Sequence, residues 1–164
     1  GVQSVEDVIK AAEIGVAGVV LSNHGGRQLD FSRSPNEVLA EAAPIIKARN
    51  LEKQFELFVD GGVCRGTDIL KALCLGATGV GLGRPFLYAN STYGEAGVRK
   101  LIEKLNFEIE LSMRSLGVTS IKDLNQDLLD LSALKNRSVA VPTDFLYSDT
   151  YIKESLADFQ PLTI

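Results

Sequence analysis

Residues 16–28 read VAGVVLSNHGGRQ, and this stretch decides the fold. Its first six residues form a short apolar run rich in β-branched side chains, which predicts a strand buried on both faces. A polar loop with two adjacent glycines follows at once. In parallel α/β sheets, the loops that follow the strands carry the ligand-binding groups. The stretch therefore predicts one strand and, directly after it, one candidate site.

The same pattern recurs twice further along the chain. Residues 55–59 (FELFV) predict a second strand and are followed by DGGV at 60–63. Residues 78–83 (TGVGLG) predict a third strand, which is followed by Arg84 and Pro85. Three strands, each with glycine-rich residues at its end, indicate a repeated βα unit.

Helices are predicted before and between these strands. One starts after Ser4 and stops at Gly15. A second opens at Ser34, where Pro35 suits the first helical position and Glu37 completes a capping box. A third covers 67–75.

The remaining segments are less regular. Pro44 lies inside the second helical pattern and predicts a kink or break. Residues 94–116 predict a long amphipathic helix that ends at Gly117, and 121–131 predict one or two short helices. From residue 134 onward the periodicity fades into an extended, aromatic-bearing tail, which we expect to dock on another surface.

These elements predict an α/β fold with parallel strands. Three strands cannot close a barrel, so the chain is either the last part of a (β/α)8 TIM barrel or a small open sheet. The chain starts with Gly1 and reads at once as the exit from a strand into a helix. We therefore expect a fragment of a barrel, with residues 1–133 as the barrel part and 134–164 as the tail.

Composition excludes several classes of function. The 164 residues are 45% hydrophobic, which is enough for a core, and the net charge is −4. This negative net charge argues against non-specific electrostatic binding to nucleic acid or to an anionic membrane. No apolar run is long enough to span a bilayer. Cys64 and Cys74 have neither a second CxxC nor a histidine cluster beside them, so we expect no metal site and a reduced compartment.

His24 and Arg27 are the candidate catalytic pair of the first loop. His24 is the single histidine of the chain, and a histidine can accept a proton near neutral pH. Arg27 offers a planar fork that suits a carboxylate. The other interpretation is a surface histidine beside an arginine paired with Asp30, and spacing alone leaves both open.

The two later strand ends are candidate anion sites. Glycines at 60–63 and 81–84 let backbone N–H groups approach a phosphate, and a following helix adds partial positive charge. The alternative is that these glycines only make tight turns. GLG at 81–83 is not a dinucleotide fingerprint, because no third glycine follows at the required spacing. No base is implied near Cys64, so a packed or incidental thiol is favoured over a nucleophile.

These motifs together resemble a known family. Residues 21–30 (LSNHGGRQLD) resemble the signature of the FMN-dependent α-hydroxy-acid oxidoreductases, and 58–63 and 81–86 resemble its two later flavin-phosphate segments. Residues 114–119 (RSLGVT) and the tail are most similar to the cytochrome-linked L-lactate dehydrogenases of that family.

The resemblance implies a role for each matched residue. His24 corresponds to the active-site base and Arg27 to the arginine that binds the substrate carboxylate. The residues that match the FMN-binding stretches are Asp60, Gly61, Gly62, Val63, Cys64, Gly83 and Arg84.

The resemblance also implies the reaction and its setting. L-lactate or a similar 2-hydroxy acid would be oxidised to the 2-oxo acid, with FMN as cofactor and cytochrome c as electron acceptor. Haem b would belong to an upstream domain, the tail would join a homotetramer, and the location would be the mitochondrial intermembrane space, otherwise the cytoplasm.

One departure from the family pattern concerns Cys64. The family usually has arginine at this position, where it meets the phosphate, and losing such a charged hydrogen bond costs about 1.5–3 kcal/mol. Arg65 follows at a helix start, where we expect its side chain to point elsewhere.

Two alternatives stay open. One is a glycolate-oxidase-like (S)-2-hydroxy-acid oxidase. The other is an inactive fragment or an assembly module, since the rest of the site would lie upstream and the isolated chain is expected to be inactive.

Overall fold

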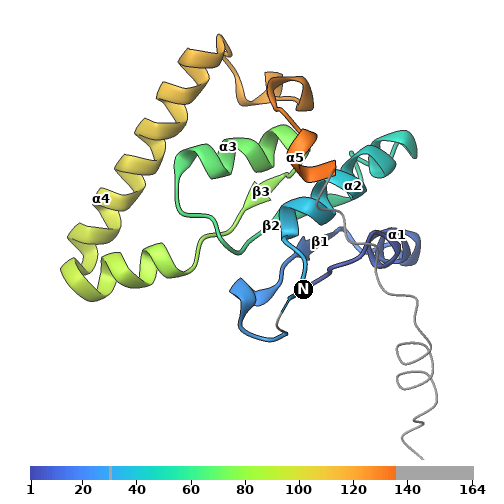
Figure 1. The fold of residues 1–164 in the computed structure, drawn as a ribbon, viewed down its shortest axis with the longest axis horizontal. Coiled ribbons are helices and arrows are strands. Elements are labelled where there is room, and N and C mark those ends of the chain that lie inside the picture. The colour runs from blue at the N-terminus through green and yellow to red at the C-terminus, as the bar shows by residue number, and fades with distance from the viewer. Residues whose placement is uncertain (30, 136–164) are drawn as a thin grey trace, which may run out of the picture.

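The computed structural model describes residues 1–29 and 31–135, and at its centre lies a parallel sheet. The strands are β1 (Gly18–Leu21), β2 (Glu56–Val59) and β3 (Gly79–Val80), in the order β1-β2-β3. Helices alternate with them: α1 (Val5–Ile14), α2 (Pro35–Ala48) and α3 (Gly66–Leu75). The predicted βα repeat with parallel strands is therefore confirmed (Figure 1).

The start of the chain behaves as the end of a strand. Val2 forms a parallel bridge with Leu21, in which the Val2 amide donates to the Val20 carbonyl at 3.0 Å. The chain then enters α1, and the Ser4 hydroxyl accepts a hydrogen bond from the Asp7 amide at 3.1 Å. The predicted exit from a strand into a helix is thus correct.

The core lies between the sheet and the helices α1, α2 and α3. Val8, Val38 and Leu39 are fully buried, and they belong to one cluster with Leu21 and Val59 of the strands. Full burial of each such side chain stabilises the fold by about 1.5–3 kcal/mol. This cluster sets the positions of β1 and β2, and hence of the loops that follow them.

The opposite face of the sheet is open. Val20 and Phe58 pair in register, and their exposed fractions are 44% and 36%. Successive side chains of a strand point to opposite faces, and here the helices pack on the Leu21 and Val59 side. The prediction that the first strand is buried on both faces is therefore wrong for the part of the chain that the structure describes.

The second helix differs from its prediction in two ways. Ser34 is the N-cap residue, but its hydroxyl makes no capping hydrogen bond, so the capping box with Glu37 is wrong. The amide of Glu37 donates instead to the Ser34 carbonyl at 3.0 Å, and Pro35 presets the first turn. The helix also continues through Pro44 to Ala48, so the break is absent, and the alternative of a kink stays a prediction.

The helix α4 (Arg84–Leu116) begins earlier than the sequence pattern predicts. Gly94 has φ 57° and ψ −143°, which bends the helix into two parts (Figure 1). The predicted helix over 94–116 corresponds to the second part. The first part was missed because 84–93 contain Asn, Ser, Thr and Tyr, which have low helix propensity. The strand β3 covers only two residues, where the sequence predicted 78–83, because 81–83 form a loop before α4.

Three short elements follow α4: the 3-10 turns η2 (Ile121–Asp123) and η3 (Gln126–Leu128), and the helix α5 (Ser132–Lys135). They confirm the short helices predicted over 121–131. Gln126 Nε2 donates to the Leu75 carbonyl at 3.3 Å and ties this segment to the end of α3. The boundary at 133/134 is untested, and the aromatic tail beyond residue 135 lies outside the described residues. None of the described helices is both long and apolar enough to cross a membrane.

Candidate active site

The loops that follow the three strands meet around a single pocket of about 350 Å³. Every residue that the sequence singled out for a site lines it: His24, Arg27, Asp60, Gly61, Gly62, Val63, Cys64, Gly83 and Arg84. These residues are up to 60 positions apart in the chain, and the parallel strands bring them together because their carboxyl ends share one edge of the sheet.

His24 opens the short 3-10 turn η1 (His24–Gly26), and Arg27 is the residue that caps its end. His24 has φ 55°, a left-handed conformation uncommon for residues other than glycine, although histidine tolerates it better than most. Its amide donates to the Ser22 hydroxyl at 3.0 Å, and the Arg27 amide donates to the His24 carbonyl at 3.3 Å. The exposed side chains of His24 and Arg27 therefore extend from the same hydrogen-bonded turn. The alternative partner of Arg27, Asp30, lies outside the described residues.

Asn23 of the first loop lies against Gly61 of the second, an approach that the sequence did not reveal. Its Nδ2 donates to the Arg33 carbonyl at 3.3 Å, while its Oδ1 is buried without a hydrogen-bond partner. A Cβ at Gly61 would lie 2.9 Å from that Oδ1, and Gly61 has φ 85°. Glycine is therefore required at this position both by the close approach and by the backbone conformation.

Arg84 joins the third strand end to the first loop. Its Nη2 donates to the Gly25 carbonyl at 2.9 Å. Arg84 also opens α4, whose N-cap is Gly83, and a Cβ at Gly83 would meet nothing within 4 Å. A helix amino terminus, an arginine and free space together make this corner of the pocket attractive to an anion.

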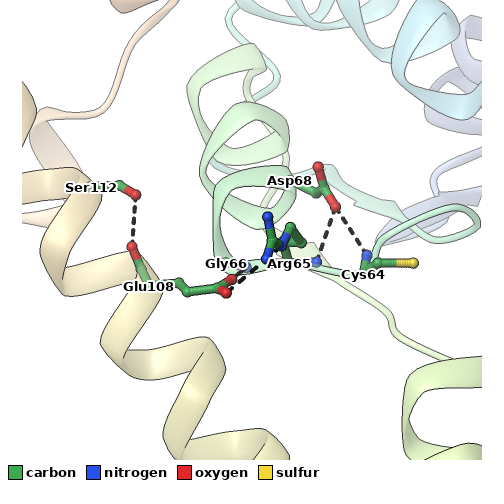
Figure 2. A network of polar contacts seen from close by, with 6 residues as sticks. All are labelled: Cys64, Arg65, Gly66, Asp68, Glu108 and Ser112. Carbon is green, nitrogen blue, oxygen red and sulfur yellow. Dashed lines mark hydrogen bonds and ion pairs between the residues drawn. The ribbon is translucent and has the colours of Figure 1, made fainter.

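Cys64 and Arg65 point in different directions. Cys64 is exposed and lines the pocket, so of the two alternatives, a packed or an incidental thiol, the packed one is excluded. Arg65 does not line the pocket, and its Nε lies 3.8 Å from Glu108 Oε1 on α4 (Figure 2). The expectation that Arg65 points away from the phosphate region is therefore confirmed.

Cys74 is the thiol that packs in the interior. Its side chain is buried, and burial raises the pKa of the Cys74 thiol. It lines a second pocket of about 440 Å³, formed by the ends of α2 and α3, the start of β2 and residues 124–127. That pocket holds none of the predicted site residues.

The donor and acceptor groups of the site fit a phosphorylated polyol. Asp60 Oδ1 is buried without a hydrogen-bond partner, so it can accept from a hydroxyl group. Gly83 and Arg84 offer donors for a phosphate. The described residues hold no group of three or more side chains suited to a metal ion. A phosphate at one end and hydroxyls nearer Asp60 are the features of the FMN side chain.

Comparison with known proteins defines the class. The chain belongs to the FMN-dependent dehydrogenase family, whose sequence profile matches residues 1–131. Among the family members it is similar to the L-lactate dehydrogenase (cytochrome) of Saccharomyces cerevisiae, with 70% identity over 160 residues. The same name is borne by a relative from Wickerhamomyces anomalus with 60% identity over 161 residues. Both alignments cover 98% of this chain.

A peroxisomal (S)-2-hydroxyacid oxidase of Arabidopsis thaliana is 43% identical over 127 residues, which is 77% of this chain and 34% of that protein. The chain spans 27% of the Saccharomyces enzyme and 28% of the Wickerhamomyces enzyme, about a quarter of their length.

Solved structures agree with this assignment. The recombinant flavin-binding domain of baker's yeast flavocytochrome b2 superimposes with a TM-score of 0.80 and 70% identity, over 98% of this chain and 41% of that one. A mandelate oxidase mutant superimposes with a TM-score of 0.70 and 39% identity, over 77% of this chain and 38% of that one. The expected fold class, part of a (β/α)8 barrel with further helices, is thereby confirmed, as are the family and its cofactor FMN.

Proposed function

We propose that this chain supplies the base, the carboxylate anchor and part of the FMN site of an L-lactate dehydrogenase that passes electrons to a cytochrome. The observation that carries the proposal is the convergence of nine residues from three strand ends on one pocket. The likeness to two enzymes named L-lactate dehydrogenase (cytochrome) supports the substrate and the acceptor.

His24 and Arg27 have different roles toward the substrate. Arg27 binds the carboxylate through its planar fork, which fixes the position of the adjacent hydroxyl-bearing carbon. His24 accepts one proton as the 2-hydroxy acid becomes the 2-oxo acid. FMN, when bound, would accept the two electrons together with the second proton released in this oxidation. Two hydrogen bonds within the turn from Ser22 to Arg27 hold the backbone of the base and of the anchor close together.

The cofactor-binding residues lie on the other two loops. Gly83 and Arg84 hold the phosphate at the start of α4, and Asp60 accepts from the ribityl hydroxyls. Gly61, Gly62, Val63 and Cys64 form the wall between them. The lack of an arginine at Cys64 leaves Arg84 as the main charged contact to the phosphate.

The length of the matches favours a cytochrome over oxygen as acceptor. The two cytochrome-linked relatives align with 98% of the chain, whereas the Arabidopsis oxidase aligns with 77%. A flavocytochrome b2 mutant has been solved with pyruvate bound, which is the 2-oxo acid derived from lactate. An (S)-2-hydroxy-acid oxidase is the second candidate, supported by several plant oxidases at 43–45% identity.

The setting of the enzyme belongs to the same proposal. Cytochrome c is the acceptor, haem b is carried by a separate domain, and residues 134–164 join the subunits of a homotetramer beside the barrel part at 1–133. The location is the mitochondrial intermembrane space. The open sheet face at Val20 and Phe58 supports a need for further barrel strands, so the 164-residue chain alone is inactive.

The visible spectrum of flavin tests the proposal. The complete natural polypeptide that contains this sequence is expected to show a flavin band that bleaches with L-lactate in the absence of oxygen. His24→Gln is expected to slow the bleaching by at least about 10²-fold and leave FMN bound. A correctly folded polypeptide without a flavin band would contradict the proposal.

The acceptor is tested separately. Cytochrome c reduction by the lactate-reduced polypeptide is expected to exceed hydrogen peroxide formation in air. If peroxide forms at the rate of lactate consumption and cytochrome c stays oxidised, the second candidate holds instead.

A further inference from the structure

Two carboxylates occupy the amino terminus of α3. Asp68 Oδ2 accepts hydrogen bonds from the amides of Cys64 and Arg65, both at 3.0 Å. Glu108 Oε2 accepts from the Gly66 amide at 2.8 Å (Figure 2). The first N–H groups of a helix carry partial positive charge and attract anions when they are free. Here the N–H group of Gly66, the first residue of α3, and those of Cys64 and Arg65 just before it already bind the protein's own carboxylates.

Glu108 reaches α3 from a distant part of the chain. It lies 42 residues beyond Gly66, in the second part of α4. The two helices approach so closely that a Cβ at Gly66 would lie 2.7 Å from Glu108 Cβ and 2.8 Å from the Leu105 carbonyl oxygen. Helix packing therefore fixes Glu108 against the start of α3, and Arg65 Nε lies 3.8 Å from the same carboxylate.

The amino terminus of α4 differs from that of α3. Arg84 and Gly83 line the pocket there, and no acidic residue lies in the first turn of α4. At α3 the two carboxylates outweigh the single charge of Arg65, which points away from the pocket. Cys64, between the two helix starts, contributes no charged side chain at the position where the family usually has arginine.

We propose that Asp68 and Glu108 close the amino terminus of α3 to anions and thereby direct the phosphate of FMN to the amino terminus of α4. Glu108 is a positioning residue in this arrangement, since it does not line the pocket and acts through the start of α3. The inference rests on the proposed function, because it assumes that this pocket binds FMN.

Affinity for FMN and for riboflavin tests the inference, since riboflavin lacks the phosphate. The measurement uses the apo form of the complete natural polypeptide, at low ionic strength, with flavin fluorescence as the signal. Glu108→Gln keeps a carbonyl oxygen for the Gly66 amide and removes the charge. The expected result is FMN binding that is about two- to five-fold tighter, with riboflavin binding unchanged. The gain should shrink at high salt, because salt screens the charges.

Matched variants show whether the change in FMN affinity comes from the carboxylate at α3 or from the removal of any negative charge. Glu110→Gln makes the same change two residues away, at an exposed carboxylate paired with Arg114, and is expected to leave the ratio of FMN to riboflavin affinity unchanged. Arg65→Gln leaves Glu108 unbalanced and is expected to weaken FMN binding. Asp68→Asn provides a second neutralisation, expected to act in the same direction as Glu108→Gln, should the latter fail to fold.

The possible failures are distinguishable. If the natural polypeptide binds FMN, but neutralising Asp68 or Glu108 leaves the FMN to riboflavin ratio unchanged, the inference is overturned and the proposed function stands. The same holds if riboflavin affinity changes in parallel with FMN affinity. If the natural polypeptide binds no FMN, both are overturned.

Discussion

Arg84 Nη2 donates a hydrogen bond to the carbonyl oxygen of Gly25 at 2.9 Å, across 59 residues of sequence. Gly25 directly follows the proposed base, His24, and Arg84 opens the helix that is proposed to bind the cofactor phosphate. One guanidinium therefore connects the loop that carries the proposed base to the loop that is proposed to bind the cofactor phosphate. We expect this bond to restrain motion of the His24 turn.

Replacing Arg84 should affect both sides of the pocket. In Arg84→Ala we expect FMN affinity to fall by about 10- to 100-fold, because a hydrogen bond to a charged group contributes about 1.5–3 kcal/mol. We also expect faster amide hydrogen exchange at residues 25–27. Flavin titration and hydrogen exchange of the complete natural polypeptide measure these effects. Unchanged exchange in the turn would show that the bond to Gly25 does not restrain it.

Restoring the family arginine at Cys64 should strengthen cofactor binding. We expect Cys64→Arg to raise FMN affinity by about 10-fold or more, through one charged hydrogen bond to the phosphate. Riboflavin affinity should not change. Cys64→Ser is the control, since it leaves the site without the charge. Equal FMN affinities of the arginine and serine variants would contradict the assignment of this loop to the phosphate end of the cofactor.

Gly61 should tolerate substitution poorly. Alanine at φ 85° adopts a left-handed conformation that costs about 1–2 kcal/mol, and its Cβ would also press on Asn23 Oδ1. We expect Gly61→Ala to lower the free energy of unfolding by more than Gly117→Ala. Gly117 has φ 69°, but no atom lies within 4 Å of the position of an added Cβ. The loss of stability in Gly117→Ala therefore measures the backbone strain alone. Denaturant unfolding of both variants measures the free energies of unfolding. Equal decreases in the two variants would show that the Asn23 side chain moves aside without loss of stability.

The two thiols should differ in reactivity. Cys64 is exposed and should react with a thiol reagent in the folded protein, whereas buried Cys74 should react only on unfolding. Burial raises the pKa of the Cys74 thiol above its ordinary value, so its contribution to stability is complete below about pH 8.5 and declines as the pH rises through the folded-state pKa. Reagent kinetics in folded and denatured protein check the first expectation. Denaturant unfolding of Cys74→Ala beside the natural chain, at neutral and alkaline pH, checks the second.

Local sequence predicted the parts of the fold that local chemistry determines. Gly15 and Gly76 end their helices in left-handed conformations, and α1, α2 and α3 lie where the sequence pattern predicted helices, whereas α4 begins earlier than predicted. The nine site residues were identified because they cluster after the strands and match a family pattern. Parallel pairing then brought them to one edge of the sheet.

The contacts that the sequence could not predict are those made between distant segments. Glu108 had no local feature that separates it from the other acidic residues of α4, and its bond to Gly66 depends on how two helices pack. The role of Asn23 likewise depends on the approach of a glycine 38 positions later. The exposure of Val20 and Phe58 could not be predicted either. An apolar run predicts a strand, but it does not show whether other elements cover one face of that strand or both.

The bend at Gly94 separates two duties of a single helix. The part of α4 before Gly94 starts at Arg84, in the proposed phosphate site. The part after Gly94 carries Glu108, which bonds to the start of α3. The conformation at Gly94, φ 57° and ψ −143°, is one that residues with a side chain avoid. A genetic screen for loss of function would therefore recover Gly94 alongside His24, although Gly94 does not line the pocket. Selection would therefore act on the angle between the two segments of α4 as strictly as on the reacting side chains.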